Sequence, residues 1–190
     1  KDLSNNTKVI SGILNKGLDY SFGVQTGDAV DAGAVYSYWN ELIDCFDSNG
    51  LKNIDMVHVL GNHEYEGDGE AANATDIYNL PANDMYSVEY DNLYVAVINY
   101  KSADNAALAA TGEWVVQDAA KSNAQWKILL MHQPPSYPNI QGGGDFINKN
   151  LPKYLEEAGI NMVFSGHDHT LARTLPLTAG EVDEENGIVY

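Results

Sequence analysis

The sequence predicts an α/β fold, a layered sandwich of mixed, largely parallel β-sheet flanked by helices. Short apolar runs alternate with helical patterns along most of the 190 residues, and this alternation produces parallel strands covered by helices. One pair of apolar runs is instead separated only by Asp91 and Asn92, a pair typical of hairpin turns, which adds an antiparallel element. The length suits a single domain over residues 1–190.

The first half of the chain is predicted to hold two helices, each followed by a short strand. Apolar residues recur at helical spacing over residues 7–18 and 34–47, which indicates helices. Apolar runs over residues 21–26 and 55–60 have the length of strands, and a glycine follows each of them. Both strands therefore end in turns that can present polar side chains.

The second half is predicted to contain a hairpin and then alternating helices and strands. Its elements are a hairpin of strands at 86–90 and 93–99, a helix at 111–123, a strand at 127–131, a helix at 146–158 and a strand at 160–164. Pro152 is expected to interrupt or kink the last helix. Residues 137–145 hold three consecutive glycines and are predicted to form a flexible rim. No Gly-Lys-Ser/Thr follows, so this segment is not a phosphate-binding P-loop.

Composition excludes several classes of function. The net charge is −17, with 27 acidic and 10 basic residues, which disfavours nucleic-acid binding through a basic patch. Arg173 is the only arginine, so no arginine cluster can hold phosphate. Cys45 is the only cysteine, which excludes an internal disulfide and thiolate zinc sites, and we expect it in the core. No apolar run approaches the roughly 18–20 residues of a membrane span.

Side chains that bind metal ions follow the ends of predicted strands. In open α/β sheets these ends share one crevice, where ligands bind. The residues are Asp28 after the first strand, Asn62 and His63 after the second, His132 after the strand at 127–131, and His167 and His169 after the last. Imidazole and carboxylate suit zinc, iron or manganese, and one carboxylate can bridge two cations. His58 lies inside a strand and is predicted to be structural.

The ordered motifs resemble those of the calcineurin-like metallophosphoesterase superfamily over about residues 21–177. They are Gly-Asp-Ala-Val-Asp at 27–31, Gly-Asn-His-Glu at 61–64, His132, and Gly-His-Asp-His-Thr-Leu-Ala-Arg at 166–173. The last motif, together with Val-Asp-Ala-Gly at 30–33 and Tyr-Trp-Asn at 38–40, looks most like the purple-acid-phosphatase-related branch. The resemblance implies two divalent or trivalent metal ions, such as iron, zinc or manganese.

The resemblance also implies a role for each matching residue. Asp28 would bridge both metals, Asn62, His132 and His167 would bind the second, and His169 would bind the first. His63 would position the phosphate, together with Asn62, and protonate the leaving oxygen. Glu64 would orient His63, as carboxylates commonly do for catalytic imidazoles.

Departures from the family pattern leave some roles open. No Asp-x-His precedes Gly27, so we expect the domain to lack its first strand motif, with the protein continuing before Lys1, and to lack C-terminal strands. Asp31 stands where the coloured iron enzymes carry tyrosine, so no purple centre is expected. Asp31 either binds the first metal or caps the following helix or loop. Ala32 stands where the protein-phosphatase branch has arginine, which argues against a dedicated phosphoprotein phosphatase. Arg173 either contacts substrate or pairs with a carboxylate away from the metals.

The function expected from these residues is hydrolysis of phosphate esters by a hydroxide that two metals activate, with His63 as general acid. The partner would be a small phosphate ester, and the oligomeric state stays open. A metal-binding or structural module without turnover is the alternative. An amidohydrolase or metallo-β-lactamase-like enzyme would need an early His-x-His cluster, which is absent. The resemblance favours an extracellular or cell-envelope location, with the cytoplasm as the alternative.

Overall fold

The computed structural model describes residues 3–81, 85–99, 101, 107–135, 147 and 149–190. The predicted glycine-rich rim at 137–145 lies outside these residues. In the first half the elements are α1 (Leu3–Leu14), β1 (Phe22–Gln25), α2 (Tyr36–Ser48), β2 (Asp55–His58), the short 3₁₀ helix η1 (His63–Tyr65) and α3 (Ala72–Ile77). In the second half they are β3 (Met85–Tyr90), β4 (Leu93–Ile98), α4 (Leu108–Ala119), β5 (Trp126–Met131), α6 (Pro152–Glu157), β6 (Met162–Phe164), β7 (Leu177–Thr178) and β8 (Glu181–Val182).

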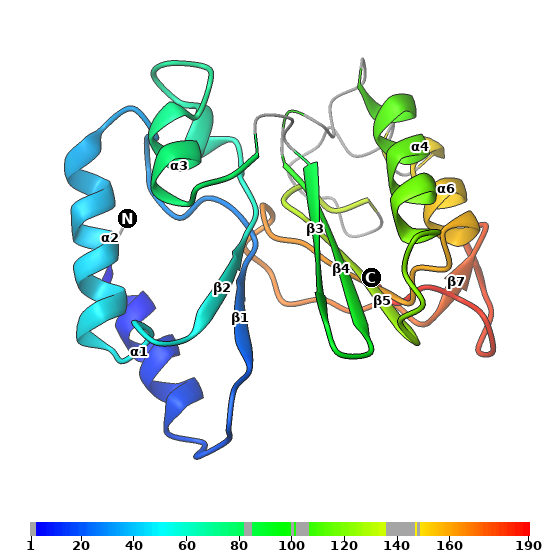
Figure 1. The fold of residues 1–190 in the computed structure, drawn as a ribbon, viewed down its shortest axis with the longest axis horizontal. Coiled ribbons are helices and arrows are strands. Elements are labelled where there is room, and N and C mark those ends of the chain that lie inside the picture. The colour runs from blue at the N-terminus through cyan, green and yellow to red at the C-terminus, as the bar shows by residue number, and fades with distance from the viewer. Residues whose placement is uncertain (1–2, 82–84, 100, 102–106, 136–146, 148) are drawn as a thin grey trace.

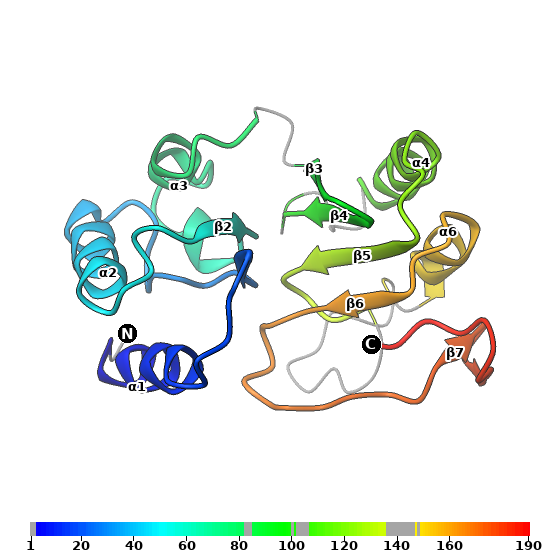
Figure 2. The same cartoon turned by 60° about the horizontal axis from the view of Figure 1, so that its bottom comes forward.

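The strands form two larger sheets that pack against each other, with helices on the outer side of each (Figure 1). β1 and β2 pair in parallel, and α1, α2 and α3 lie beside them. The second sheet has the order β3-β4-β5-β6, in which β3 is antiparallel and the other pairs are parallel. α4 and α6 lie on its outer side (Figure 2). The predicted mixed, largely parallel sandwich is confirmed; its layers are the sheets β1-β2 and β3-β4-β5-β6, and β7 and β8 form a separate antiparallel pair.

The alternation of side chains along β4 explains how this strand joins two core regions. Tyr94, Ala96 and Ile98 point toward α4 and α6 and belong to the core under those helices. Val95 and Val97 point the other way and pack with Val57, Val59 and Leu130 between the two sheets. Every residue from Tyr94 to Ile98 is at most 2% exposed, as expected for a strand covered on both faces.

Two local predictions about single residues are confirmed. Cys45 is buried, on the face of α2 that also buries Trp39 and Leu42 at helical spacing. Pro152 interrupts the predicted last helix, because α6 begins at this residue, where a proline costs no hydrogen bond. Within the described residues, none of the helices is both long and apolar enough to cross a membrane.

Candidate metal centre

The loops that follow β1, β2, β5 and β6 meet at the junction of the two sheets (Figure 2). They bring together Asp28, Asn62, His132 and His167. His132 Nε2 lies 3.2 Å from Asn62 Oδ1, from Asp28 Oδ2 and from His167 Nδ1. His167 Nδ1 also lies 3.2 Å from Asn62 Oδ1. One ligand atom from each of Asp28, His132 and His167 lies within 4.8 Å of the others, close enough for all three to reach one cation.

His132 is held in the orientation that a metal ligand needs. Its Nδ1 donates to the backbone carbonyl of Thr26 at 2.8 Å, because a carbonyl can only accept. In the neutral ring the lone pair of His132 then sits on Nε2 and faces Asp28 Oδ2 and Asn62 Oδ1, which are acceptors too. Acceptors packed this closely repel one another unless a proton or a cation lies between them. The donor set of imidazole, carboxylate and amide oxygen fits a transition metal or zinc.

The pKa of His167 favours the neutral form that binds metal. Burial of the ring and the neighbouring His132 lower this pKa below its ordinary value of 6.5. His167 is thus largely deprotonated at neutral pH, as metal ligation by imidazole requires.

Strained backbone marks the loops that carry the site. Asp28 has φ 55, His167 has φ 66 and His169 has φ 52, all in the left-handed region that non-glycine residues rarely adopt. Strain of this kind persists where the surrounding structure enforces it, commonly at functional sites. Glycines let the loops approach one another. A Cβ at Gly27 would lie 2.4 Å from His132 Nδ1, and one at Gly61 would lie 2.3 Å from Asp28 Oδ1.

His63 borders the cluster with about a third of its side chain exposed. Its backbone N–H donates to Asp28 Oδ1 at 3.0 Å, and its Nδ1 donates to the carbonyl of Asp31 at 2.7 Å. Nδ1 also lies 3.4 Å from Glu66 Oε2. Nε2 lies 3.9 Å from Asp28 Oδ2, so this nitrogen can face a group bound at the cluster.

Glu64 makes contacts that differ from those predicted. We expected its carboxylate to orient the His63 ring, but the partners of His63 Nδ1 are Asp31 and Glu66. The Glu64 side chain is fully buried, and its oxygens accept hydrogen bonds from the backbone N–H groups of Asp28, Ala29 and Gly61. The physical reason is that these buried N–H groups need acceptors, and a buried carboxylate needs donors.

The other predicted site residues lie around the cluster. Asp31 touches the site through its backbone carbonyl, and in the described part of the chain no side-chain hydrogen bond caps α2, whose N-cap is Val35. Asp31 is thus not the N-cap residue of α2, and its predicted roles as a metal ligand or as the cap of a loop stay predictions. His169 is exposed, and the group of converging ligands found among the described residues does not include it. Arg173 is exposed on the segment beyond.

Two groups that act at the cluster were not predicted from the sequence. The Thr26 carbonyl that fixes His132 is a backbone group, which no residue pattern reveals. Asp168, to which the sequence motif assigned no role, is only 7% exposed although it lies between two histidines. Its charge raises the pKa of His167, against the larger lowering effects of burial and His132.

His58 lies apart from this cluster, in line with the predicted structural role. Its ring stacks on Tyr78 with centroids 3.6 Å apart and planes 6° from parallel. Burial lowers the pKa of His58 from 6.5 to about 4. In the described part of the chain its buried Nδ1 has no hydrogen-bond partner, so the ring is neutral at pH 7.

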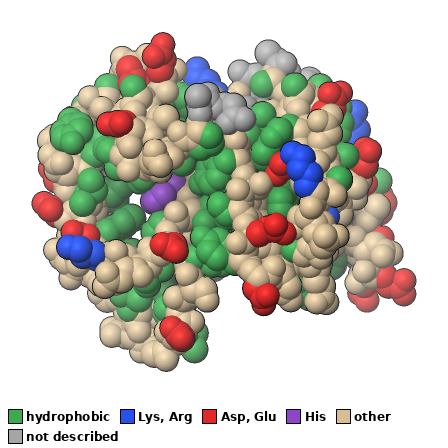
Figure 3. Space-filling model, viewed as in Figure 1, with side chains coloured by type: hydrophobic (Ala, Val, Ile, Leu, Met, Phe, Trp, Pro, Cys, Tyr) green, Lys and Arg blue, Asp and Glu red, His purple; other side chains and the backbone are tan. Residues whose placement is uncertain are grey.

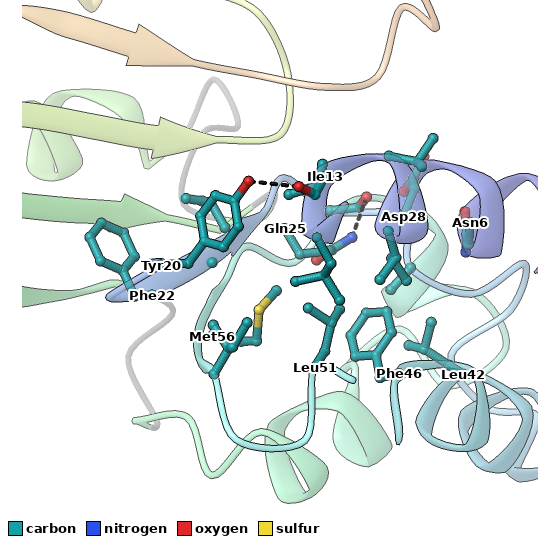
Figure 4. A pocket seen from close by; sticks show the side chains of 18 residues that line it. Asn6, Ile13, Tyr20, Phe22, Gln25, Asp28, Leu42, Phe46, Leu51 and Met56 are labelled. Atoms are coloured by element: carbon teal, nitrogen blue, oxygen red, sulfur yellow. Dashed lines mark hydrogen bonds between the residues drawn. The ribbon is translucent and has the colours of Figure 1, made fainter. Parts of the chain in front are cut away.

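An apolar cavity of about 390 Å³ lies between α1, α2 and β1 (Figure 4). Asp28 is among its lining residues, but most of the lining is aliphatic or aromatic. Two polar donors beside it are engaged: Tyr20 donates to the carbonyl of Ile13 at 2.7 Å, and Gln25 Nε2 donates to that of Gly27 at 2.7 Å. The buried Gln25 Oε1, which has no hydrogen-bond partner among the described residues, is an acceptor and would not bind an anion. A phosphate would find little to bind in this cavity.

Acidic side chains are scattered over the face of the molecule seen in Figure 3. A phosphate that binds to such a surface needs a cation close by to offset the repulsion.

Comparison with known proteins identifies a family and relatives. The family model described as calcineurin-like phosphoesterase matches residues 3–171. Purple acid phosphatase 17 of Arabidopsis thaliana is 24% identical over 189 residues, covering 84% of this chain and 56% of that protein. The mouse (Mus musculus) serine/threonine-protein phosphatase CPPED1 is 28% identical over 132 residues, covering 62% of this chain and 42% of that protein. The chain thus spans about half the length of these curated relatives.

A solved structure resembles the fold over nearly the whole chain. The purple acid phosphatase PPD1 from yellow lupin (Lupinus luteus) seeds has a TM-score of 0.77 and covers 97% of this chain and 38% of its own. Sequence identity is 19%, so this likeness concerns the fold alone.

Proposed function

Because the chain belongs to the calcineurin-like phosphoesterase family, we propose that it hydrolyses phosphate esters with two divalent or trivalent metal ions and with His63 as general acid. The observation that carries this proposal is the convergence of three potential ligand atoms: Asp28 Oδ2 and Asn62 Oδ1 each lie 3.2 Å from His132 Nε2. A cation would turn their mutual repulsion into attraction.

Four residues would hold the second metal of the pair: Asp28, Asn62, His132 and His167. The first metal would share the Asp28 carboxylate and take His169, with Asp31 as a further candidate. When bound, the metals would lower the pKa of a water molecule and neutralise charge on the phosphate, the usual contribution of such pairs in hydrolysis.

The chain's own groups would orient the reaction. The bond to Thr26 fixes the His132 ring, and the bond from the His63 N–H fixes Asp28 Oδ1. His63 Nδ1–H is held by the Asp31 carbonyl, so the imidazolium form carries its transferable proton on Nε2. That nitrogen, 3.9 Å from Asp28 Oδ2, would donate the proton to the leaving oxygen.

The decisive experiment compares His63→Ala with the parent protein on aryl phosphates. We expect turnover to fall by roughly 10²–10⁴-fold, the usual size of a general-acid effect, with metal content unchanged by elemental analysis. The loss should be larger for phenyl phosphate than for 4-nitrophenyl phosphate, because the poorer leaving group depends more on protonation. His58→Phe, at a histidine outside the cluster, is the matched control. Equal rates for His63→Ala and parent would show that the assigned role is wrong.

One observation favours a second candidate, a metal-binding module without turnover. Among the described residues, the histidines and carboxylates that converge are three, Asp28, His132 and His167, and with the Asn62 amide they suit a single ion. Metal stoichiometry separates the two: one tightly held ion per chain and no hydrolysis of mono- or diesters would favour the module.

For the proposed phosphoesterase, the natural substrate would be a small phosphate ester. An extracellular or cell-envelope location belongs to the same proposal. Detection of the protein only in a cytosolic fraction would contradict that location.

A further inference from the structure

Glu64 fills a concave turn of backbone N–H groups directly behind Asp28. Its Oε2 accepts from the N–H of Asp28 at 2.8 Å, and its Oε1 accepts from that of Ala29 at 2.7 Å, with the Val30 N–H at 3.4 Å. Oε2 also accepts from the N–H of Gly61 at 2.6 Å. With the side chain 0% exposed, one carboxylate thus joins the loop after β1 to the loop after β2.

The left-handed conformation of Asp28 is what creates this concavity. A residue in the left-handed region turns successive N–H groups toward one side, and such a nest binds anions. Asp28 has φ 55, and the N–H groups of residues 28–30 all point at Glu64. The same turn directs the Asp28 carboxylate to the other side, where Oδ2 lies 3.2 Å from His132 Nε2.

Backbone hydrogen bonds and direct backbone contact also join the loop after β1 to the loop after β2 around Glu64. The Gly33 N–H donates to the carbonyl of His63 at 2.8 Å, and the Ala34 N–H donates to that of Glu66 at 3.1 Å. A Cβ at Gly33 would lie 1.8 Å from the Glu64 carbonyl oxygen, so the backbones are in direct contact. These bonds fix the backbone of Glu64, and its carboxylate then reaches back across 36 residues of sequence to Asp28.

We propose that Glu64 is a positioning residue for Asp28: its carboxylate occupies the backbone nest at residues 28–30 and holds Asp28 in the left-handed turn that aims its side chain at the metal cluster. This proposal rests on the metal-dependent function proposed above. Glu64 would thus orient the Asp28 carboxylate, and not the His63 ring as the sequence predicted. In this role Glu64 acts through the backbone: its hydrogen-bond partners among the described residues are N–H groups of the main chain.

Glu64→Gln is the sharpest variant because it keeps the shape and removes one acceptor. Whichever oxygen becomes NH₂, the new donor meets at least one backbone N–H that also donates, since both oxygens are used. Glu64→Asp is the second variant, with the charge kept and the reach shortened. Glu70→Gln, at an exposed glutamate of the same segment, is the charge-matched control.

Binding of Mn²⁺ alone is measured for each protein, together with thermal unfolding without metal. We expect Mn²⁺ affinity to fall 10–100-fold in Glu64→Gln, the range found when a partner behind a metal ligand is removed, and to stay unchanged in Glu70→Gln. A purely structural role would lower the unfolding temperature and leave Mn²⁺ affinity of the folded protein intact. That result would overturn the proposal.

Amide hydrogen exchange of the unmutated protein provides a measurement that no folding defect can obscure. The N–H groups of Asp28, Ala29 and Gly61 should be protected in the absence of metal, unlike those of ordinary exposed loops. Exchange at open-loop rates would overturn the role of Glu64. Failure of the unmutated protein to bind Mn²⁺ would instead contradict the proposed metal-dependent function, and the exchange data would still test the nest.

Discussion

The buried His58, which lies outside the metal cluster, should make the stability of the protein depend on pH by a predictable amount. Its ring is stacked on Tyr78, and burial lowers its pKa from 6.5 to about 4. Between these two pH values the unfolded chain binds a proton on His58 and the folded chain does not. Stability is therefore fully present above pH 6.5 and is lost as the pH falls toward 4.

The size of the effect follows from the shift. One pKa unit corresponds to about 1.4 kcal/mol, so this residue should remove about 2.5 kcal/mol of unfolding free energy between pH 7.5 and pH 4.5. His58→Phe keeps an aromatic ring to stack on Tyr78 and cannot titrate. It also removes the buried Nδ1, which has no partner among the described residues.

Urea unfolding of both proteins at pH 4.5, 5.5, 6.5 and 7.5 measures the difference. The other titrating groups are common to the two proteins, so subtraction isolates position 58. We expect His58→Phe to lose less stability on acidification, by about 2.5 kcal/mol over the full range. Parallel stability curves, differing by less than about 0.5 kcal/mol in their pH dependence, would refute the buried, neutral assignment. Reduced Mn²⁺ affinity in the variant would refute the separation of His58 from the site.

Two further predictions follow from close contacts elsewhere. Gly61→Ala places a Cβ 2.3 Å from Asp28 Oδ1, so Mn²⁺ affinity measured by titration should fall at least 10-fold; unchanged affinity would show that the loop adjusts freely. Asp118→Asn weakens the acceptor shared by Ser87 Oγ at 2.6 Å and Tyr94 Oη at 2.9 Å. Urea unfolding should show a loss of about 1–2 kcal/mol with metal binding intact, whereas a variant as stable as the parent would mean that solvent replaces these bonds.

Strand positions were predictable because they depend on local patterns. The apolar runs before Gly27 and Gly61 end where β1 and β2 lead into their loops, and the polar residues after them could be read directly from the chain. The division into two sheets was not predictable in this way. Which strands pair depends on contacts between distant residues, such as the stacking of Phe22 on Tyr90 with centroids 4.2 Å apart.

The candidate site shows the same limit. Asp28, Asn62, His132 and His167 could be named because each follows a strand. The contacts of Glu64 could not, because its partners Asp28 and Ala29 are backbone groups 36 and 35 residues away. α3 was missed for a related reason: it has only six residues, and its N-cap, Ala71, has φ 54 and a side chain that cannot cap.

The origin of the four converging residues has a mechanical consequence. Asp28 and Asn62 come from the sheet of β1 and β2, while His132 and His167 come from the sheet of β5 and β6. A metal ion bound by all four residues would cross-link the two sheets of the sandwich. At a free metal concentration of 100 times Kd, such cross-linking adds about 2.7 kcal/mol to folding. The protein's resistance to heat and proteolysis would then track the metal supply of its surroundings.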